Sequence, residues 1–290
     1  MTLSAGRLRR YVRDKIGRFA RTNYSGAIAR LQKSSQSRKD AKAREEVKSM
    51  GYRIAPGYHH IQINRDPSKP HIIATFQDSK GRPQRIEAKG YRSTQDEKKF
   101  ARGELFVNKH EEMMRKIVAD TKHSDEARAL YLIAKTGFRA GGEGDGKADK
   151  KAYGAANMLS SHVKVSGITS TFNFTGKKGV EQNHVVHDSL IASFFTGKSG
   201  RVFNTTDAKI LKYVKQFHPE FKTKDFRTHV ATSTALEHVN KITPPKNKKE
   251  YNAKVMEVAT IVSQKLGNTP AMAKNSYIDP AVFKRWENGI

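Results

Sequence analysis

Residues 172–179 read FNFTGKKG and belong to a segment, Val163 to Val186, in which apolar and polar side chains alternate. This period of two is typical of β-strands, and it predicts that Phe172 and Phe174 share one face. The turn at 176–179, bounded by glycines, predicts a hairpin between two strands. Because helical patterns precede and follow this hairpin, the predicted fold class is α+β.

Helices are predicted on both sides of the hairpin from apolar spacing and from capping residues such as Ser124. They are expected at 98–119, 124–135, a segment capped by Asp207, 225–239, 251–266 and a short stretch near Trp286. We therefore expect residues 96–290 to form a mostly helical domain that contains the hairpin.

Residues 49–95 have a different pattern, with short strands expected at 60–64, 71–76 and 84–88 and a turn at 78–81. They predict a small antiparallel β domain, and the polar segment Ser93–Glu97 is a candidate hinge. Residues 1–48 hold 14 Lys and Arg against 4 Asp and Glu, a net charge of +10, with a basic amphipathic helix expected over 7–21. This N-terminal arm fits a DNA-tracking segment, a solvated tail or an organelle transit peptide.

The whole chain is strongly basic, with 55 Lys and Arg against 28 Asp and Glu and a net charge of +27. Such an excess indicates a polyanionic partner, because neutralised phosphates release counterions. The absence of cysteine excludes disulfides, thiol nucleophiles and Cys-ligated zinc. No apolar run reaches the roughly 18 residues of a membrane helix, and no carboxylates accompany His59-His60 or His184 and His187, so no metal site is predicted.

Four short blocks carry the candidate chemistry, and three of them centre on a cation. In chain order they are TGFRAG at 136–141, FNFTGK at 172–177, KDFRT at 224–228, and LGNTP at 266–270 followed by Ser276-Tyr277-Ile278. Each Arg or Lys alone is more typical of a solvated charge or a contact to a DNA backbone. The ordered combination resembles the type IB DNA topoisomerases, specifically their poxvirus-like and bacterial branch, over about residues 50–287.

This resemblance implies two domains that clamp double-stranded DNA and an isomerase that relaxes supercoils. Tyr277 would be the nucleophile that becomes joined to the 3′-phosphate of the cut strand. Arg139 and Arg227 would hold the non-bridging phosphate oxygens, since guanidinium forks match that geometry and stay charged. They would replace Mg²⁺, so no metal is expected. The covalent phosphotyrosine would keep the energy of the broken bond, so religation would need no ATP, and no cofactor is expected.

Three further positions match the family's catalytic set. Lys177, at the hairpin tip, corresponds to the general acid for the 5′-oxygen, and Lys224 to a second proton-relay lysine. Asn268 stands where related enzymes usually have His, so it is expected to orient a phosphate oxygen without titrating. Expected DNA contacts are Arg82, Gln84 and Arg85 in the β domain, which resembles the clamping domain through Asp78-x-x-Gly81-Arg82-x-Gln84, and Lys178 in the hairpin.

Two alternatives stay open at this point. A tyrosine recombinase shares the nucleophile and fold, but it typically has His where this chain has Lys224, and a helical rather than β-rich N-terminal domain. The other alternative is a non-catalytic DNA-binding protein. The intact catalytic set argues against it: Tyr277, Arg139, Arg227 and Lys177. We expect a monomeric, intracellular, DNA-associated protein without a membrane segment.

Overall fold

The structure is a computed structural model that describes residues 24–142 and 151–287 of the 290-residue chain. It divides into two compact units, with the division after Gln95. Each unit is described by itself below. Among the described residues, no helix is long and apolar enough to span a membrane, and no three His, Asp or Glu side chains gather in the way a metal site requires. The helix predicted over 7–21 lies outside the described residues.

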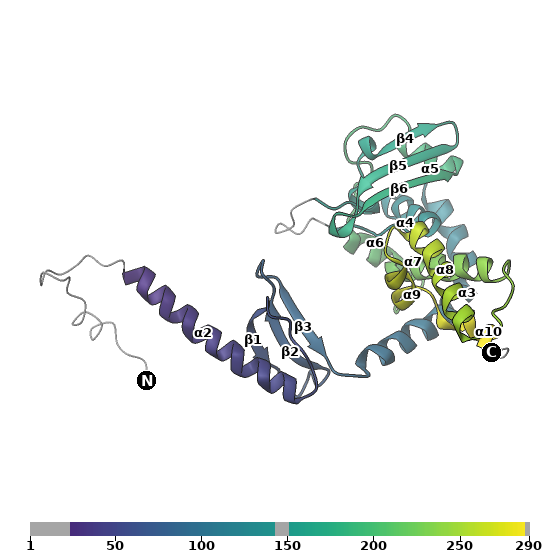
Figure 1. The fold of residues 1–290 in the computed structure, drawn as a ribbon. Helices are drawn as coiled ribbons and strands as arrows, with labels where there is room; N and C mark the ends of the chain where they lie inside the picture. The colour runs from purple at the N-terminus through teal and green to yellow at the C-terminus, as the bar shows by residue number, and fades with distance from the viewer. Residues whose placement is uncertain (1–23, 143–150, 288–290) are drawn as a thin grey trace, which may run out of the picture. The chain divides into compact units, whose positions relative to one another are not determined.

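The first unit joins a long helix to a three-stranded antiparallel sheet (Figure 1). Helix α2 covers Tyr24–Ser49, and strands β1, β2 and β3 cover His59–Ile63, Ile72–Gln77 and Pro83–Glu87 in the order β1-β2-β3. Their small core consists of Val47, Ile54, Ile61, Ala74 and Phe76. The strands agree with the sequence prediction to within a residue or two, because their apolar positions alternate.

Helix α2 is attached to the sheet through polar contacts as well as through Val47. The Asp40 carboxylate accepts hydrogen bonds from the backbone N–H groups of His60 and Ile61, at 3.0 and 2.9 Å. These bonds lie at an irregularity of the β1–β2 register, where His60 has a φ of 53°. The basic arm predicted over 1–48 therefore includes residues, from Asp40 to Val47, that pack on the sheet of this unit.

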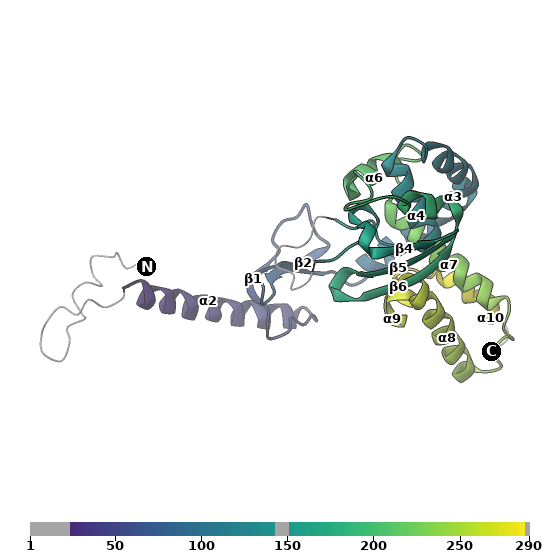
Figure 2. The same ribbon diagram turned by 90° about the horizontal axis from the view of Figure 1, so that it is seen from above.

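The second unit places a three-stranded antiparallel sheet against a group of helices (Figure 2). Strands β4, β5 and β6 are Val163–Ser166, Thr169–Thr175 and Glu181–His187, in the order β4-β5-β6. Helix α4 (Asp125–Thr136) lies at the centre and packs against α5 (Ser189–Phe195), α6 (Asp207–Val214) and α7 (Thr223–Val239). The main core includes Phe172 and Phe174, which are both buried on one face as their spacing predicted.

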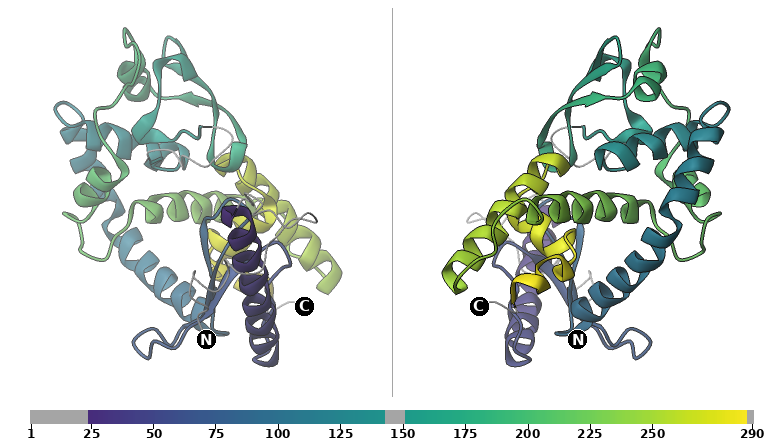
Figure 3. Two further views of the ribbon diagram at one scale, coloured as in Figure 1. Left: turned by 90° about the vertical axis from the view of Figure 1, so that its left-hand side faces the viewer. Right: turned by 90° about the vertical axis from the view of Figure 1, so that its right-hand side faces the viewer.

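A second core of this unit lies between the C-terminal helices (Figure 3). Helix α8 (Lys248–Leu266) packs against both α7 and α9 (Pro270–Ser276). The short η4 (Pro280–Phe283) and α10 (Lys284–Glu287) close the group around Trp286, which is 1% exposed. This core supports the end of α8 and the whole of α9, the two elements on either side of the LGNTP motif.

The structure corrects several expected boundaries. Residues 93–97, the candidate hinge, contain the division between the two units after Gln95, but they are helical and belong to α3 (Tyr91–Asp120). The predicted hairpin is part of a three-stranded sheet. The side chain that caps α6 belongs to Thr206, whose Oγ1 accepts from the Lys209 N–H, while Asp207 is the first helical residue. The prediction of Ser124 as the cap of α4 is confirmed, since its Oγ accepts from the Ala127 N–H.

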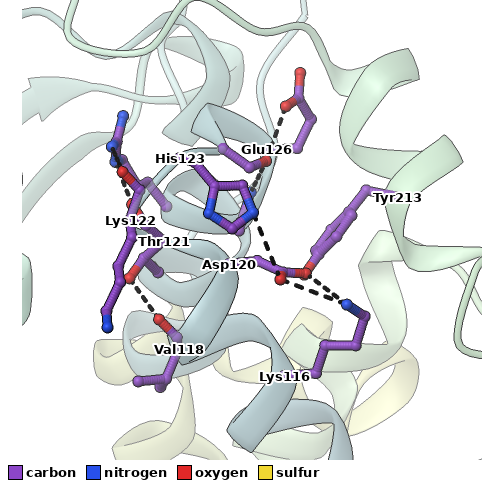
Figure 4. Close-up of polar contacts among 11 residues, drawn as sticks. Lys116, Val118, Asp120, Thr121, Lys122, His123, Glu126 and Tyr213 are labelled. Carbon is purple, nitrogen blue, oxygen red and sulfur yellow. Dashed lines mark hydrogen bonds and ion pairs between the residues drawn. The ribbon is translucent and has the colours of Figure 1, made fainter.

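Helices α3, α4 and α6 meet at a polar corner (Figure 4). The Asp120 carboxylate accepts a 2.7 Å hydrogen bond from the Tyr213 hydroxyl and pairs with Lys116 at 3.1 Å. The hydrogen bond from Tyr213 and the charge of Lys116 lower the pKa of Asp120, although its burial acts the other way. Burial and the neighbouring carboxylate raise the pKa of Tyr213, so this phenol is kept protonated and serves structure.

Two histidines of the second unit are held neutral by their surroundings. Burial, and then the neighbouring His110, lower the pKa of His229 to about 4. The two imidazoles have ring centroids 4.0 Å apart. Burial, and then the charges of Lys265 and Arg227, lower the pKa of His184 to about 4. Both values lie below the roughly 6.5 of an unfolded histidine, so the unfolded chain binds protons first as the pH falls.

We therefore expect the contribution of these two histidines to the free energy of unfolding to be constant above about pH 7 and to fall between pH 6.5 and 4. Each of His229 and His184 should contribute a loss of about 2 kcal/mol at pH 5. Urea unfolding at pH 7.5 and pH 5 measures this. The substitution His229→Asn should remove part of the pH dependence, whereas His123→Asn, at a side chain that is 73% exposed, should not. The same pH dependence in both variants would contradict this assignment.

Candidate active site

Tyr277 directly follows α9 and is buried, with 3% of its surface exposed. The hydroxyl of Thr269 caps the start of helix α9, and Pro270 is the first residue of the helix. The backbone on either side of the phenol is also held: the Lys99 ammonium donates to the Ser276 carbonyl at 3.3 Å. The Thr232 hydroxyl donates to the Tyr277 carbonyl at 3.4 Å and accepts from the Asp279 N–H at 3.2 Å. The position of the phenol is thus determined by contacts from α3 and α7.

Three cations surround the phenol of Tyr277. An Arg139 guanidinium nitrogen donates to its hydroxyl oxygen at 3.2 Å. The Lys224 ammonium and the Arg227 guanidinium carbon each lie 4.9 Å from the ring centroid. Burial alone would raise the pKa of Tyr277, but the charges of Arg227, Arg139 and Lys224 outweigh it and lower the pKa below its usual value near 10. The site therefore stabilises the phenolate, which is the nucleophilic form, more than water does for a free tyrosine.

Arg227 is the most deeply placed cation of this site, at 3% exposure. Its guanidinium donates to the carbonyl of Gly137, which follows α4. It also donates to the carbonyl of Leu266, the last residue of α8, at 2.7 Å. Its Nε–H is buried and has no hydrogen-bond partner among the described residues. Burial, and then the nearby Arg139, lower its pKa to about 10, so it is still protonated at neutral pH.

The first turn of α7 is anchored by a buried ion pair. Asp225, at 7% exposure, accepts two hydrogen bonds from the Arg102 guanidinium of α3, at 2.9 and 3.0 Å. It also accepts from the Lys222 N–H at the start of the helix. Because α7 begins at Thr223, Lys224 and Arg227 are three positions apart on one helical face, as the sequence predicted.

Lys224 is exposed along its side chain but has a lowered pKa. The protein around its ammonium displaces water, and the charges of Lys99 and Arg139 act in the same direction, while Tyr277 acts against them. A lysine with a lowered pKa exchanges its proton more readily near neutral pH, which suits a proton relay.

Asn268, which follows the Gly267 cap of α8, carries an unpaired polar side chain. Its backbone N–H bonds to the Ser263 carbonyl at 3.0 Å, but its side-chain oxygen and nitrogen are both buried and find no partner among the described residues. Leaving a buried amide unpaired costs about 1 to 3 kcal/mol, which calls for a reason. The Asn268 side chain lies two residues after Leu266, whose carbonyl accepts from Arg227, and its amide N–H groups are available to an acceptor such as a phosphate oxygen.

Lys177 is not part of this cluster in the structure. It opens the short turn η3 (Lys177–Gly179) between β5 and β6 and is exposed, and its side chain has no hydrogen bond or ion pair to any described residue. The side chain of Lys178, in the same turn, is not among those that the structure describes. The structure thus brings together Tyr277, Arg139, Arg227 and Lys224, with Asn268 at the end of α8, and leaves the lysine of the hairpin outside.

The expected DNA contacts of the first unit lie in β3 and the turn before it. The Arg82 Nε bonds to the Asp78 carboxylate at 2.7 Å, so it stabilises this turn. Arg85 pairs with Glu87 at 2.7 Å and remains 55% exposed, and Gln84 is exposed. Surface pairs of this kind are weak, so Arg85 can exchange its partner for a phosphate.

Three residues that hold the site were not found from the sequence: Lys99, Arg102 and Thr232. Each acts on a residue far away in the chain, up to 177 positions for the bond from Lys99 to Ser276. None has a neighbouring motif, so no local pattern could have indicated it. Their shared effect is to fix the backbone around the phenol and the first turn of α7.

The chemistry of this arrangement is that of an anion site with a built-in nucleophile. A buried phenol with a lowered pKa faces Arg139, Arg227 and Lys224, and no carboxylate bonds to any of these three cations among the described residues. Fixed cations in a site that excludes water stabilise the charge that develops on a phosphoryl group under attack. Attack by the phenolate would produce a phosphotyrosine.

Comparison with known proteins agrees with this chemistry. Residues 88–288, more than half of the chain, match the family described as "Eukaryotic DNA topoisomerase I, catalytic core". A relative from Acanthamoeba polyphaga mimivirus, named "DNA topoisomerase 1B", is 26% identical over 265 residues, which cover 81% of this chain and 78% of that protein. The matched segment contains the phenol and all the cations around it.

Proposed function

Because the chain belongs to the DNA topoisomerase I catalytic-core family, it is a type IB DNA topoisomerase, and we propose that it cuts one DNA strand through Tyr277. The Tyr277 oxygen attacks a backbone phosphorus, the bond to the 5′-oxygen breaks, and the strand stays joined through a 3′-phosphotyrosyl bond. Rotation of the free end relaxes supercoils. The 5′-hydroxyl then attacks the same phosphorus and displaces the phenolate. The energy of the broken bond is kept in the phosphotyrosine, so no ATP is needed.

Each cation has one role in this mechanism. Arg139 and Arg227 hold the non-bridging oxygens, and Asn268 donates its amide N–H to one of them. Lys177 protonates the departing 5′-oxygen, and Lys224 takes part in the proton relay. Lys177 reaches the leaving group once DNA is bound, since an exposed lysine at a turn can enter a groove. The β-rich first unit also binds the duplex, through Arg82, Gln84, Arg85 and the basic α2, and the protein acts as a monomer.

One observation carries this proposal: the buried phenol of Tyr277 lies among three cations that lower its pKa. A tyrosine that served packing alone would not need this surplus of positive charge. The unpaired Asn268 amide and the Arg227 Nε–H support the same conclusion, because a phosphate would supply the acceptor for the N–H groups. The site contains Lys224 where recombinases typically have His, which favours the topoisomerase over that alternative.

The test is relaxation of supercoiled plasmid in EDTA without ATP, with rapid denaturation to trap covalent adducts. We expect relaxation and an adduct whose phosphorylated peptide contains Tyr277. An adduct without relaxation would indicate a recombinase instead. Relaxation with the phosphate on another tyrosine would contradict the assigned nucleophile. The absence of both relaxation and adduct would indicate a non-catalytic DNA-binding protein.

The position of Arg139 depends on close contact between two backbone segments. The Ala155 N–H donates to the Arg139 carbonyl at 2.9 Å. A β-carbon at Gly154 would lie 2.6 Å from that carbonyl oxygen and 2.7 Å from the Gly141 α-carbon, so the segment would have to move. We expect Gly154→Ala to slow single-turnover cleavage about 10- to 100-fold, because small displacements of a catalytic group are costly. The control is Gly103→Ala, where a β-carbon meets no atom within 4 Å; equal rates for both variants would contradict this.

A further inference from the structure

The side chain of Gln182 links two catalytic segments that have no motif in common. It belongs to β6, opposite Phe174 of β5, and only 6% of it is exposed. Its amide nitrogen donates to the Gly267 carbonyl at 3.1 Å. Gly267 stands directly before Asn268, so this bond joins the sheet to the end of α8.

The contact at Gly267 is close enough to exclude any other residue there. A β-carbon at Gly267 would overlap the Gln182 amide, and its φ of 57° also favours glycine. The Gly267 N–H caps α8 by bonding to the carbonyls of Gln264 and Ser263. The end of α8 is therefore a fixed point, supported by the C-terminal core, to which Gln182 is attached.

The stem of Gln182 contacts the other segment. A β-carbon at Gly176 would lie 3.0 Å from the Gln182 γ-carbon and 3.2 Å from the Val180 carbonyl oxygen. Gly176 stands directly before Lys177, and its N–H closes the turn by bonding to that Val180 carbonyl at 2.7 Å. One side chain thus touches the residue before Lys177 and bonds to the residue before Asn268.

A further contact fixes the amide of Gln182. Its oxygen lies 3.4 Å from the Nε2 of His184, which is neutral at working pH and can donate there. The His184 ring packs edge-on against Phe138, at 4.9 Å between centroids, and Phe138 directly precedes Arg139. With its oxygen bonded to His184, the Gln182 amide presents its nitrogen to Gly267.

We propose that Gln182 is a positioning residue for the general acid: it ties the base of the β5–β6 turn to the end of α8, so that Lys177 can reach the leaving 5′-oxygen. This inference rests on the proposed function, in which Lys177 supplies that proton. The hairpin is the part that needs the tether, because the Lys177 side chain makes no bond to the described residues. Losing the tether should impair proton donation while leaving DNA binding intact.

The experiment compares Gln182→Met, which keeps the volume but removes the donor, with Lys177→Ala and with Asn183→Ala, an exposed neighbour on the same strand. Cleavage under single-turnover conditions is measured on a normal oligonucleotide duplex and on one with sulfur in place of the 5′-bridging oxygen. A thiolate leaves without a proton, because its pKa is near 8.5. We expect Gln182→Met to be about 10- to 100-fold slower on the normal duplex, with unchanged affinity, and within about 3-fold of wild type on the sulfur duplex.

Lys177→Ala should show the same rescue by sulfur, and Asn183→Ala should be near wild type on both duplexes. An equal defect of Gln182→Met on both duplexes would overturn the proposal, since it would indicate general damage. A normal rate of Gln182→Met on both duplexes would also overturn it. Where Gln182→Met lowers the thermal midpoint, Gln182→Asn, whose shorter amide cannot reach Gly267, is measured alongside. If the wild type forms no adduct at all, the proposed function itself has failed, which is a distinguishable result.

Discussion

We expect Tyr277→Phe to fold, to bind DNA with nearly the affinity of the wild type and to lose cleavage by a factor on the order of 10⁵ or more, as removal of a covalent nucleophile does. The substitution removes only the hydroxyl, which accepts a hydrogen bond from Arg139 and also interacts with Arg227. The ring stays in the same core beneath the Lys224 ammonium and the Arg227 guanidinium. Packing and the cationic surroundings are therefore preserved while the attacking atom is absent.

The measurement is adduct formation and plasmid relaxation, with thermal unfolding as the test of integrity. Tyr213→Phe is the matched control, because its hydroxyl is bonded to a carboxylate and its pKa is raised, so this phenol does not ionise. That variant should lose some stability and retain cleavage. Residual activity of Tyr277→Phe above about 1% of wild type would mean that another group attacks the phosphorus.

The second large effect is expected for Arg227→Lys. The Arg227 guanidinium uses two separate nitrogens for the Gly137 and Leu266 carbonyls and keeps its Nε–H for a phosphate. An ammonium keeps the charge, but its three N–H groups share one nitrogen and cannot reproduce this spacing. Loss of one preorganised donor to a developing oxyanion typically costs about 10²- to 10³-fold in rate. We expect a loss of this size in cleavage and in religation alike, since both pass through the same arrangement at phosphorus.

The pH dependence gives Arg227→Lys a second readout. Because Arg227 is the largest of the charges that lower the pKa of Tyr277, a less closely held cation should shift the rate profile toward higher pH. Arg115→Lys, at an exposed position of α3, controls for the change of residue type. A rate within 3-fold of wild type, with an unshifted profile, would contradict the role of the guanidinium fork.

Local patterns in the sequence determined the elements of this protein. Alternation of apolar residues predicted the strands on both sides of the turn at 176–179, because a strand buries every second side chain. Ser124 marked the start of α4, because its hydroxyl satisfies an N–H that the helix leaves free. The order of short motifs was sufficient to indicate the topoisomerase family, because each catalytic residue lies within its own recognisable block.

What only the tertiary structure decided is how those blocks meet. Arg139 and Tyr277 are 138 positions apart, Arg102 and Asp225 are 123 apart, and Gln182 and Gly267 are 85 apart. Contacts over such separations depend on the packing of α3, α7, α8 and the sheet, and they leave no periodic trace in the sequence. A phenol acquires a lowered pKa only when burial and three cations act on it together, so the chemistry of Tyr277 exists in the folded chain alone.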